Sequence, residues 1–532
     1  MKNREKLFLL LWCTAILAAC QRKVENDQIF VTTRQPVLPV LAKKEKNKVL
    51  KIKVDVKDST IAQKVTSFNF SLEGTTNISD IEMASLLYAK TGNFDEAEVL
   101  GSQKDIKSDF KMDAAHLLST GENYFWLAIS LNGTPELSHK IGARLVSVEL
   151  EDRNVVASIV DQTGSPQRIG IALRQHNDDG VNTFRIPGLA TTNNGTLIGV
   201  YDVRWDDPVD LQENIDVGLS RSTDGGQTWE PMKIIMDMGD YGGFPEDQNG
   251  IGDPAVLIDR NTNTIWVAAL WLHGYPGKRA WNASEPGLSP EKTGQFMLVK
   301  SEDDGVTWSD PINITKQIKK PEWQLFFDGP GMGITVTDGT LVFAAQFKDK
   351  DRVPHSTIIY SKDGGKKWKV GTGAKSETTE AQVVELPDGS LMLNMRDDRN
   401  RAERKDSLNG RSVAITKDLG KTWTEHPTSR KALQESNCMA SIIGYNRPDR
   451  GQLLFFSNPD TKVNRDHMTI KTSFDEGMTW PKENQLELYE DDTYGYSCLT
   501  MVDDDHIGIL YEGTKELYFE KIALEELLKK TD

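Results

Sequence analysis

The chain is 532 residues long, with 38% apolar residues, 27% charged residues and 42 glycines, a composition that excludes a disordered or collagen-like chain. A formal net charge of −16 argues against nucleic acid as a partner, because binding to a phosphate backbone needs clustered Lys and Arg. The length exceeds one ordinary core, so we expect two folded units after a short leader.

The first twenty residues have the form of a secretion signal. Three basic residues precede an apolar run, residues 7–17, that is too short to span a bilayer. Residues 17–20, Leu-Ala-Ala-Cys, resemble the bacterial lipobox, in which the cysteine is lipidated and becomes the mature N-terminus. A plain signal peptide that happens to end in Cys is the alternative. We therefore expect residues 1–20 to be a lipoprotein signal and a lipid on Cys20 to anchor the protein in the bacterial envelope, in the periplasm or at the cell surface.

The next segments differ in their patterning. Residues 21–48 are rich in Lys, Gln, Pro and Val without periodicity, so we expect a tether between the lipid and the folded protein. From residue 49 apolar and polar residues alternate, for example at Ile52, Val54 and Val56, which is typical of strands. Turn residues separate these segments. We therefore predict a β-sandwich over residues 49–152, and its role as a carbohydrate-binding module or a structural support stays open.

The remaining span, residues 153–532, contains a repeated motif, Ser/Thr-x-Asp-x-Gly-x-x-Trp. Five copies occur, at residues 222–229, 301–308, 361–368, 416–423 and 473–480. Each copy follows an alternating segment, so the repeat unit is one small antiparallel sheet. A period of about 60 residues divides this span into about six units, and the sixth lacks a recognisable motif. The predicted fold is therefore all-β, with a six-bladed β-propeller and an N-terminal β-sandwich.

The repeated motif has a mechanical explanation. Its Asp side chain can accept hydrogen bonds from the backbone of its own turn, its Gly supplies a position with positive φ, and its Trp buries a large ring under the hairpin. We therefore expect these aspartates to be structural.

A segment Phe184-Arg185-Ile186-Pro187 precedes the first copy of the motif. Together with the five motifs, which are called Asp boxes, it resembles the exosialidases of the neuraminidase superfamily over roughly residues 165–522. Asp boxes alone are a weak sign, since non-catalytic propellers also carry them. The resemblance implies an exo-α-sialidase, a glycoside hydrolase that removes terminal sialic acid from glycans, glycoproteins or glycolipids, and it implies no metal or organic cofactor.

The substrate explains why such a site needs arginines. Sialic acid carries a carboxylate on its anomeric carbon, and several guanidinium groups must converge to bind it. The family uses three arginines, which the resemblance assigns to Arg185, Arg396 and Arg465. Taken singly, Arg396 and Arg465 are typical of surface cations. Taken together and in order along the chain, the three predict a carboxylate clamp.

The same carboxylate explains the nucleophile that the resemblance implies. An ionised Asp or Glu approaching that carbon would meet like charge, whereas a neutral phenol avoids this repulsion. Sialidases with a Tyr nucleophile are a known exception to the two-carboxylate scheme. Tyr496 matches the family's Tyr-Ser segment, and Tyr494 is the nearby alternative. Glu380, 16 residues before Arg396, matches the base that removes the phenol proton.

The general acid comes from a loop after the first arginine. We assign it to Asp210, 25 residues past Arg185, in preference to Asp207. The role demands a carboxyl that is protonated near neutral pH, which burial on substrate binding favours. The resemblance assigns three further residues, two that hold ring substituents and one acid that orients Arg185: Arg204, Asp253 and Glu512.

These assignments give a retaining, double-displacement hydrolysis through a tyrosyl-enzyme intermediate. Tyr496 attacks while Asp210 protonates the departing oxygen, and Asp210 then deprotonates the water that releases sialic acid. The alternatives are a propeller lectin, a trans-sialidase or intramolecular trans-sialidase, and a structural repeat protein of the envelope. The presence of Tyr496, Glu380 and Asp210 argues against the lectin, and the products distinguish the transferases from the hydrolase.

Overall fold

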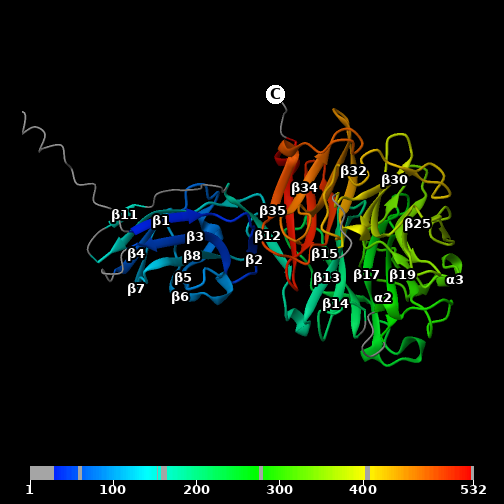
Figure 1. Cartoon of the computed structure of the whole chain (residues 1–532), viewed down its shortest axis with the longest axis horizontal. Helices are drawn as coiled ribbons and strands as arrows, with labels where there is room; N and C mark the ends of the chain where they lie inside the picture. Colours follow the sequence, from blue (N-terminus) through cyan, green and yellow to red (C-terminus); the bar gives the residue numbers. More distant parts are fainter. Residues whose placement is uncertain are drawn as a thin grey trace, which may run out of the picture.

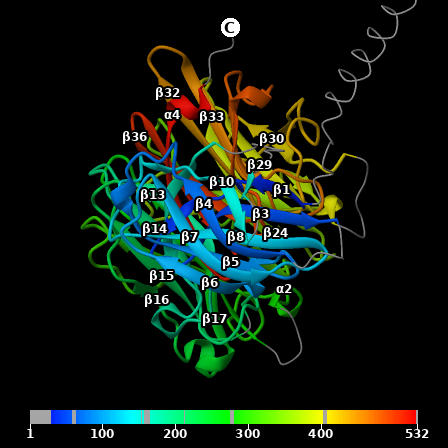
Figure 2. The same ribbon diagram turned by 90° about the vertical axis from the view of Figure 1, so that its left-hand side faces the viewer.

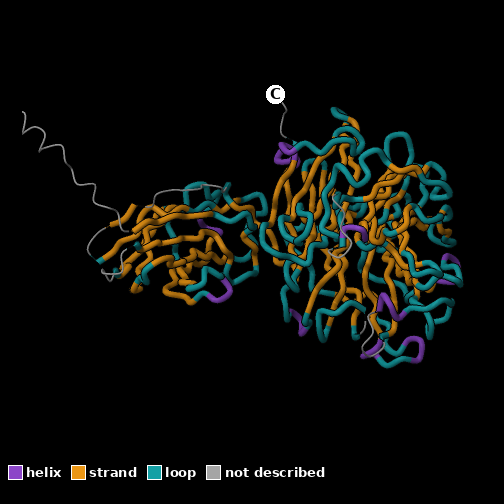
Figure 3. The backbone as a smooth tube through the Cα atoms, in the orientation of Figure 1, coloured by secondary structure: helices purple, strands orange, loops and turns teal. Residues whose placement is uncertain are grey.

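A computed structural model describes residues 29–57, 63–151, 154–156, 165–211, 213–274, 280–401 and 408–528. Figure 1 shows a smaller N-terminal body beside a larger one, and in Figure 3 both consist mainly of strands and loops. Within the described ranges the α-helices are single turns, α2 (Ala280–Ala283), α3 (Thr315–Ile318) and α4 (Leu524–Leu527). The all-β class is therefore confirmed. In that part of the chain, no helix has the length and apolar character needed to cross a membrane.

Two antiparallel sheets form the N-terminal body. The first has the order β1 (Ile29–Arg34), β3 (Asn47–Val56), β8 (Gly121–Leu131), β5 (Ile81–Ala89), β6 (Glu98–Gln103). The second has the order β11 (Asn154–Val156), β10 (Arg144–Leu150), β4 (Lys64–Ser71), β7 (Asp109–Leu117). Alternate residues of both sheets enter one core, where the rings of Phe68 and Phe125 lie 4.9 Å apart.

The expectation of a tether over residues 21–48 is wrong for its described part. Residues 29–34 form β1, which pairs with β3, and β2 (Val40–Ala42) pairs with a strand of the larger body. Ile29, Val31 and Val40 are buried. The sequence hid these strands because β1 and β2 are short and a proline-containing turn separates them. Residues 1–28, with the predicted signal and Cys20, lie outside the described residues.

The larger body contains five hydrogen-bonded sheets in the described residues. One sheet has the order β2, β12 (Gln167–Arg174), β38 (Leu517–Ala523), β37 (His506–Glu512), β36 (Ser497–Asp503), and β9 (Lys140–Ile141) also pairs with β12. It therefore joins the first strand of the larger body to its last three strands. The widest sheet has the order β13 (Thr183–Thr191), β14 (Leu197–Arg204), β15 (Ile215–Ser222), β17 (Asn249–Ile258), β18 (Ile265–His273), β19 (Gln295–Ser301), β20 (Ile312–Asn313). In the same sheet β16 (Lys233–Met236) pairs with β15, and β22 (Gly331–Met332) pairs with β17. A single parallel pair, Ile215 with Gly250, joins its two halves.

The other three sheets follow in chain order. The first has the order β21 (Leu325–Asp328), β24 (Leu341–Lys348), β25 (Pro354–Ser361), β26 (Lys369–Val370), with β23 (Ile334–Thr335) pairing β24 and β27 (Lys375–Ser376) pairing β25. The second has the order β28 (Thr378–Glu385), β29 (Leu391–Asp397), β30 (Ser412–Thr416), β31 (Thr424–Glu425). The third has the order β32 (Ser441–Arg447), β33 (Gly451–Pro459), β34 (Met468–Ser473), β35 (Gln485–Tyr489). Figure 2 views the molecule from the side of the N-terminal sheets, which lie in front of this larger body.

The Asp boxes close the hairpin turns as expected. In the first copy Asp224 accepts hydrogen bonds from the Ser222 hydroxyl at 2.8 Å and the Thr228 amide at 2.9 Å, and Trp229 Nε1 donates to the Gly226 carbonyl at 3.0 Å. The aspartates of the other four copies also accept from the amide four residues later. These carboxylates are occupied by their own turns, which supports a structural role.

Candidate active site

A cavity of about 840 Å³ opens in the larger body. Seven of the residues assigned from the sequence line it: Arg185, Asp210, Asp253, Glu380, Arg396, Arg465 and Tyr496. The other two, Arg204 and Glu512, are fully buried and form ion pairs with lining residues. Three arginines far apart in the sequence therefore reach one pocket.

Irregular backbone aims several of these side chains. The strand pairing shifts register next to Arg185, Asp253 and Glu380. At the first two places the chain passes through positive φ just before a proline, at Ile186 (56°) and at Asp253 (57°). This conformation is uncommon outside glycine and strained for a β-branched residue. Such bulges bend a strand and redirect its side chains, which here point into the cavity.

Tyr496, Glu380 and Arg396 form a closed triangle of hydrogen bonds. The Tyr496 hydroxyl donates to Glu380 Oε1 in a short contact. Arg396 Nη1 donates to Glu380 Oε2 at 2.6 Å and to the Tyr496 hydroxyl oxygen at 3.1 Å. One arginine thus contacts both the phenol and the carboxylate that can take its proton.

The electrostatics of the triangle assign its protonation state. Burial raises the pKa of the Tyr496 phenol well above 10, and the charge of Glu380 adds to this. Burial alone would also raise the pKa of Glu380, but the charge of Arg396 and the hydrogen bonds from Tyr496 and Arg396 outweigh it and lower that pKa. A neutral phenol therefore faces an ionised carboxylate, as a nucleophile and its base require.

The backbone around Tyr496 leaves little freedom for the ring. The ring centroid lies 5.2 Å from the guanidinium carbon of Arg185 and 5.7 Å from that of Arg465. The preceding residue, Gly495, has φ 92°, and a Cβ there would approach Cys438 Sγ to 2.8 Å. Only glycine fits this position, so the turn fixes the phenol between two cations.

The buried carboxylate of Glu512 binds and orients Arg185. Its carboxylate accepts from Arg185 Nε at 3.0 Å and Nη2 at 3.4 Å, and from the Ile186 amide at 3.0 Å. The side chain of Glu512 is fully buried. The bond to the Ile186 amide also explains how the strained residue keeps its positive φ.

Asp210 lies at the mouth of the cavity, with 72% of its side chain exposed. Its Oδ1 accepts from Arg204 Nη1 at 2.7 Å and from Arg185 Nη1 at 3.2 Å. Desolvation would raise the pKa of Asp210, but the charges of Arg204 and Arg185 outweigh it and lower that pKa. These contacts therefore favour the ionised form of Asp210, the predicted acid.

Arg465 differs from the other two clamp arginines. Its Nη1 donates to the Tyr494 carbonyl at 2.8 Å and its Nη2 to the Asn437 carbonyl at 3.1 Å. Among the described residues no carboxylate lies within ion-pair distance of it, whereas Glu512 pairs with Arg185 and Glu380 with Arg396. Its full charge therefore remains for an anionic ligand.

The two alternatives left open by the sequence lie outside the cavity lining. Tyr494 stacks its ring on Arg185, 4.9 Å from the guanidinium carbon, and offers its carbonyl to Arg465. Asp207 accepts the Val209 amide at 2.6 Å in its own loop. These contacts favour Tyr496 and Asp210 for the chemical roles.

Two domain families and several known proteins match this sequence. The BNR repeat-like domain family matches residues 210–511, and the N-terminal domain of BNR-repeat neuraminidase matches residues 27–154. The chain is 44% identical to a Sialidase of Bacteroides fragilis, covering 99% of this chain and 100% of that protein. It is 29% identical to a Sialidase of Clostridium perfringens, covering 70% and 96% of the two chains.

A solved structure provides a closer test of the fold. The Hadza microbial sialidase Hz136 superposes with a TM-score of 0.86 at 42% identity, covering 93% of this chain and 100% of that one. The chain belongs to the BNR-repeat sialidase (neuraminidase) family. As a member of that family it is a glycoside hydrolase.

Several residues of this sialidase-family pocket carried no recognisable sequence signal. An apolar wall contains Leu270, Trp281 and Phe327, and a basic side contains Lys348 and Arg352. Burial, with the charge of Arg352 adding, lowers the pKa of Lys348 to about 8. Lys348 Nζ lies 4.5 Å from the centroid of the Trp281 ring, although the two residues are 67 positions apart in the chain. Only the folded arrangement brings them together.

Proposed function

We propose that the chain is an exo-α-sialidase that hydrolyses terminal sialic acid from sialylated glycans with retention, through a tyrosyl-enzyme intermediate. The observation that carries this proposal is the triangle of Tyr496, Glu380 and Arg396 inside a pocket that Arg185 and Arg465 also line. A phenol with its own base beside three guanidinium groups suits a sugar whose anomeric carbon bears a carboxylate.

Substrate binding prepares the acid. The carboxylate of sialic acid binds the three arginines and competes with Asp210 for Arg185 Nη1. Asp210 then loses one of the cations that lower its pKa, and the sugar covers its exposed side chain. Both changes raise the pKa of Asp210, so the bound substrate itself favours the protonated acid that the reaction needs.

The first displacement forms the bond from the Tyr496 oxygen to the anomeric carbon and breaks the bond from that carbon to the aglycone oxygen. Asp210 transfers its proton to the departing oxygen, and the phenol proton passes to Glu380. Arg396 contacts both the phenol and Glu380, so it stabilises the negative charge as it moves between them.

The second displacement reverses these roles. Asp210 removes a proton from water, the water oxygen bonds to the anomeric carbon, and the bond to Tyr496 breaks. Glu380 returns the proton to the phenolate. Two inversions at one carbon give net retention of configuration.

We extend the proposal to the architecture. The sheets of the larger body, with the widest one divided at the single residue pair between β15 and β17, supply six groups of mainly antiparallel strands, which we assign to six blades of a β-propeller over residues 153–532. Pairing of β12 with β38 is the strand exchange that would close such a ring. The two N-terminal sheets around one core support a β-sandwich, in which β1 adds to the predicted span 49–152 and β11 shifts its end to residue 156.

We also propose that the enzyme acts in the bacterial cell envelope on glycans outside the cytoplasm. This rests on the signal-like residues 1–20 and on Cys20 at the end of the lipobox-like tetrapeptide. Metabolic labelling of the expressed protein with a fatty-acid analogue, compared with Cys20→Ser, tests the anchor. Label on both proteins or on neither would argue against it.

Product analysis tests the activity. Purified protein is incubated with α2,3-, α2,6- and α2,8-linked sialosides, and the products are identified by mass spectrometry and by NMR within the first minutes. The proposal expects free sialic acid, released first as the α-anomer. Transfer to galactose would indicate a trans-sialidase, an anhydro sugar an intramolecular trans-sialidase, and binding without release a lectin.

A further inference from the structure

One residue outside the predicted set contacts two of the three clamp arginines. The side-chain oxygen of Asn437 accepts from Arg396 Nη2 at 3.1 Å, and its backbone carbonyl accepts from Arg465 Nη2 at 3.1 Å. Asn437 is 8% exposed. It thus bridges guanidinium groups that come from positions 396 and 465 of the chain.

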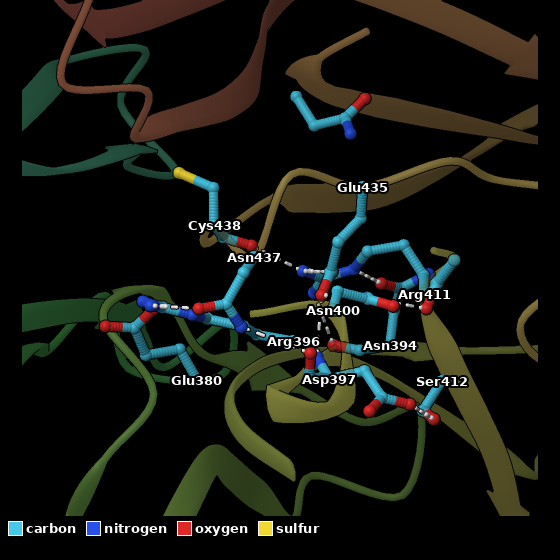
Figure 4. Close-up of polar contacts among 12 residues, drawn as sticks. Glu380, Asn394, Arg396, Asp397, Asn400, Arg411, Ser412, Glu435, Asn437 and Cys438 are labelled. Carbon is cyan, nitrogen blue, oxygen red and sulfur yellow. Dashed lines mark hydrogen bonds and ion pairs between the residues drawn. The ribbon is translucent and has the colours of Figure 1, made fainter. Parts of the chain in front are cut away.

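Asn437 is itself held from the opposite side. Its Nδ2 donates to the Asp397 carbonyl at 3.1 Å and to Asp398 Oδ1 at 3.3 Å. In Figure 4 its side chain lies between Arg396 with Glu380 on one side and Asp397 on the other. The amide therefore accepts from the arginine and donates to the chain directly after it, so it orients Arg396 relative to its own strand.

A buried ion pair fixes the backbone around Asn437. Arg411 and Glu435 are at most 1% exposed and pair at 2.6 Å. Arg411 Nη1 also donates to the Cys438 carbonyl at 2.7 Å, and Glu435 Oε1 accepts the Asp397 amide at 2.7 Å. Figure 4 shows these contacts as one polar network. Segment 435–438 is therefore tied to the end of β29, which makes Asn437 a rigid support and not a mobile loop residue.

The residue type matches all of these demands. Asn437 has φ 56°, a conformation that Asn tolerates better than most residues. An amide both donates and accepts, whereas a carboxylate cannot donate to the Asp397 carbonyl. It is also neutral, so it orients the two arginines without cancelling their charge.

We infer that Asn437 is a positioning residue that sets the spacing of Arg396 and Arg465 and thereby the affinity for the substrate's carboxylate. The inference rests on the proposed function, because it takes that carboxylate as the ligand of the clamp. Asn437 acts through the arginines and need not touch the reacting atoms.

The test compares Asn437→Gly and Asn437→Asp with Ser436→Ala. Glycine removes the side chain without strain at positive φ, and Asp keeps its shape but loses the donor. Ser436 is the matched control, because it is buried in the same segment and its hydroxyl has no partner in the described structure. The measurements are KM and kcat on a fluorogenic sialoside, calorimetric binding of 2,3-didehydro sialic acid, and thermal unfolding.

Loss of a hydrogen bond to a charged group predicts that Asn437→Gly raises both KM and the Kd of the unsaturated sugar about tenfold, with a smaller change in kcat. Asn437→Asp puts a second carboxylate on Arg396, weakens its hold on Glu380 and moves the acidic limb of the kcat/KM profile to higher pH. Ser436→Ala should match the unmodified protein.

An Asn437→Gly protein whose KM and Kd equal those of Ser436→Ala would overturn the inference, as would a loss confined to kcat. The binding measurement keeps the two proposals separate. Absence of turnover in the unmodified protein would reject the sialidase activity, whereas the effect of Asn437 on binding of the unsaturated sugar can still be measured.

Discussion

Glu512 and Tyr496 are joined by two hydrogen bonds, one from each backbone amide. The Tyr496 amide donates to Glu512 Oε2 and the Glu512 amide donates to the Tyr496 carbonyl, each at 2.9 Å. The same carboxylate binds Arg185 at 3.0 Å. The proposed nucleophile and the first clamp arginine therefore share one buried anion, so a change at Glu512 affects both.

Replacing this anion should damage binding and stability together. Glu512→Gln keeps the size of the side chain but removes the buried countercharge of Arg185, which retains only its ion pair with Asp210, whose side chain is 72% exposed. Breaking a buried pair in this way costs about 3 kcal/mol, so we expect a clear fall in melting temperature and a loss of about 100-fold in kcat/KM. Glu230→Gln, which breaks the more exposed pair with Arg221, is the control and should change neither value measurably.

Glu380, the proposed base, should determine the acidic limb of the dependence of activity on pH. Because the pKa of Glu380 is lowered below 4.5, Glu380 stays ionised and active down to acidic pH, and activity falls only as the pH drops through that lowered pKa. Arg396→Lys weakens the charge and hydrogen bonding that lower it, so the acidic limb should move to higher pH. Glu380→Gln should reduce kcat by a factor of about 100 or more. A Glu380→Gln protein with the unmodified pH profile would remove Glu380 from the mechanism.

Arg465 should contribute to binding more than to folding. Its partners are backbone carbonyls, so Arg465→Ala leaves no buried carboxylate without a countercharge. We expect KM to rise about 100-fold with only a small change in melting temperature. Steady-state kinetics beside Arg447→Ala, which removes a surface arginine paired with Asp449, provide the comparison. Equal KM values for the two variants would contradict the clamp.

The raised pKa of the buried Asp216 carboxyl predicts that the free energy of unfolding depends on pH. Burial, with the charges of Asp237 and Glu246 adding, raises its pKa to about 7 despite the bond from Trp205 Nε1 at 2.8 Å. Between its usual value of 3.8 and about 7, the folded state holds a proton that the unfolded chain has lost. Stability is therefore lost as the pH rises through this window.

Asp216→Asn keeps an acceptor for Trp205 and cannot ionise. It should match the unmodified protein near pH 4 and be more stable by about 4 kcal/mol at pH 8. Urea unfolding at both pH values measures the difference, with the exposed Asp240→Asn as control. A difference that is the same at both pH values would contradict the assignment.

Local sequence patterns were enough for the parts of the molecule that depend on neighbours in the chain. An Asp box closes its own turn, so Asp224 and Thr228 are only four residues apart and the motif is visible without a structure. The segment around Arg185 could also be recognised from the sequence, because its Arg-Ile-Pro residues form a local feature, the bulge in β13.

Contacts between different sheets left no such pattern. Asn437 follows no motif, and its importance depends on Arg396 and Arg465 meeting from two different sheets. The strands at Ile29 and Val40 were missed because their partners, β3 and β12, lie beyond a turn or in the other body. Arg204 was found, but its partner Asp202 was not, because a buried carboxylate in a strand is indistinguishable by sequence from an exposed one.

The covalent intermediate is the most direct test of the central claim. A 3-fluorosialosyl fluoride slows both displacements through its 3-fluoro group while its good leaving group lets the glycosyl-enzyme form and accumulate, so the labelled protein can be digested and sequenced by mass spectrometry. We predict one added sialyl group, on Tyr496, and no labelling of Tyr496→Phe. A label on Glu380 or Asp210, or an unlabelled protein that still turns over sialosides, would contradict the account.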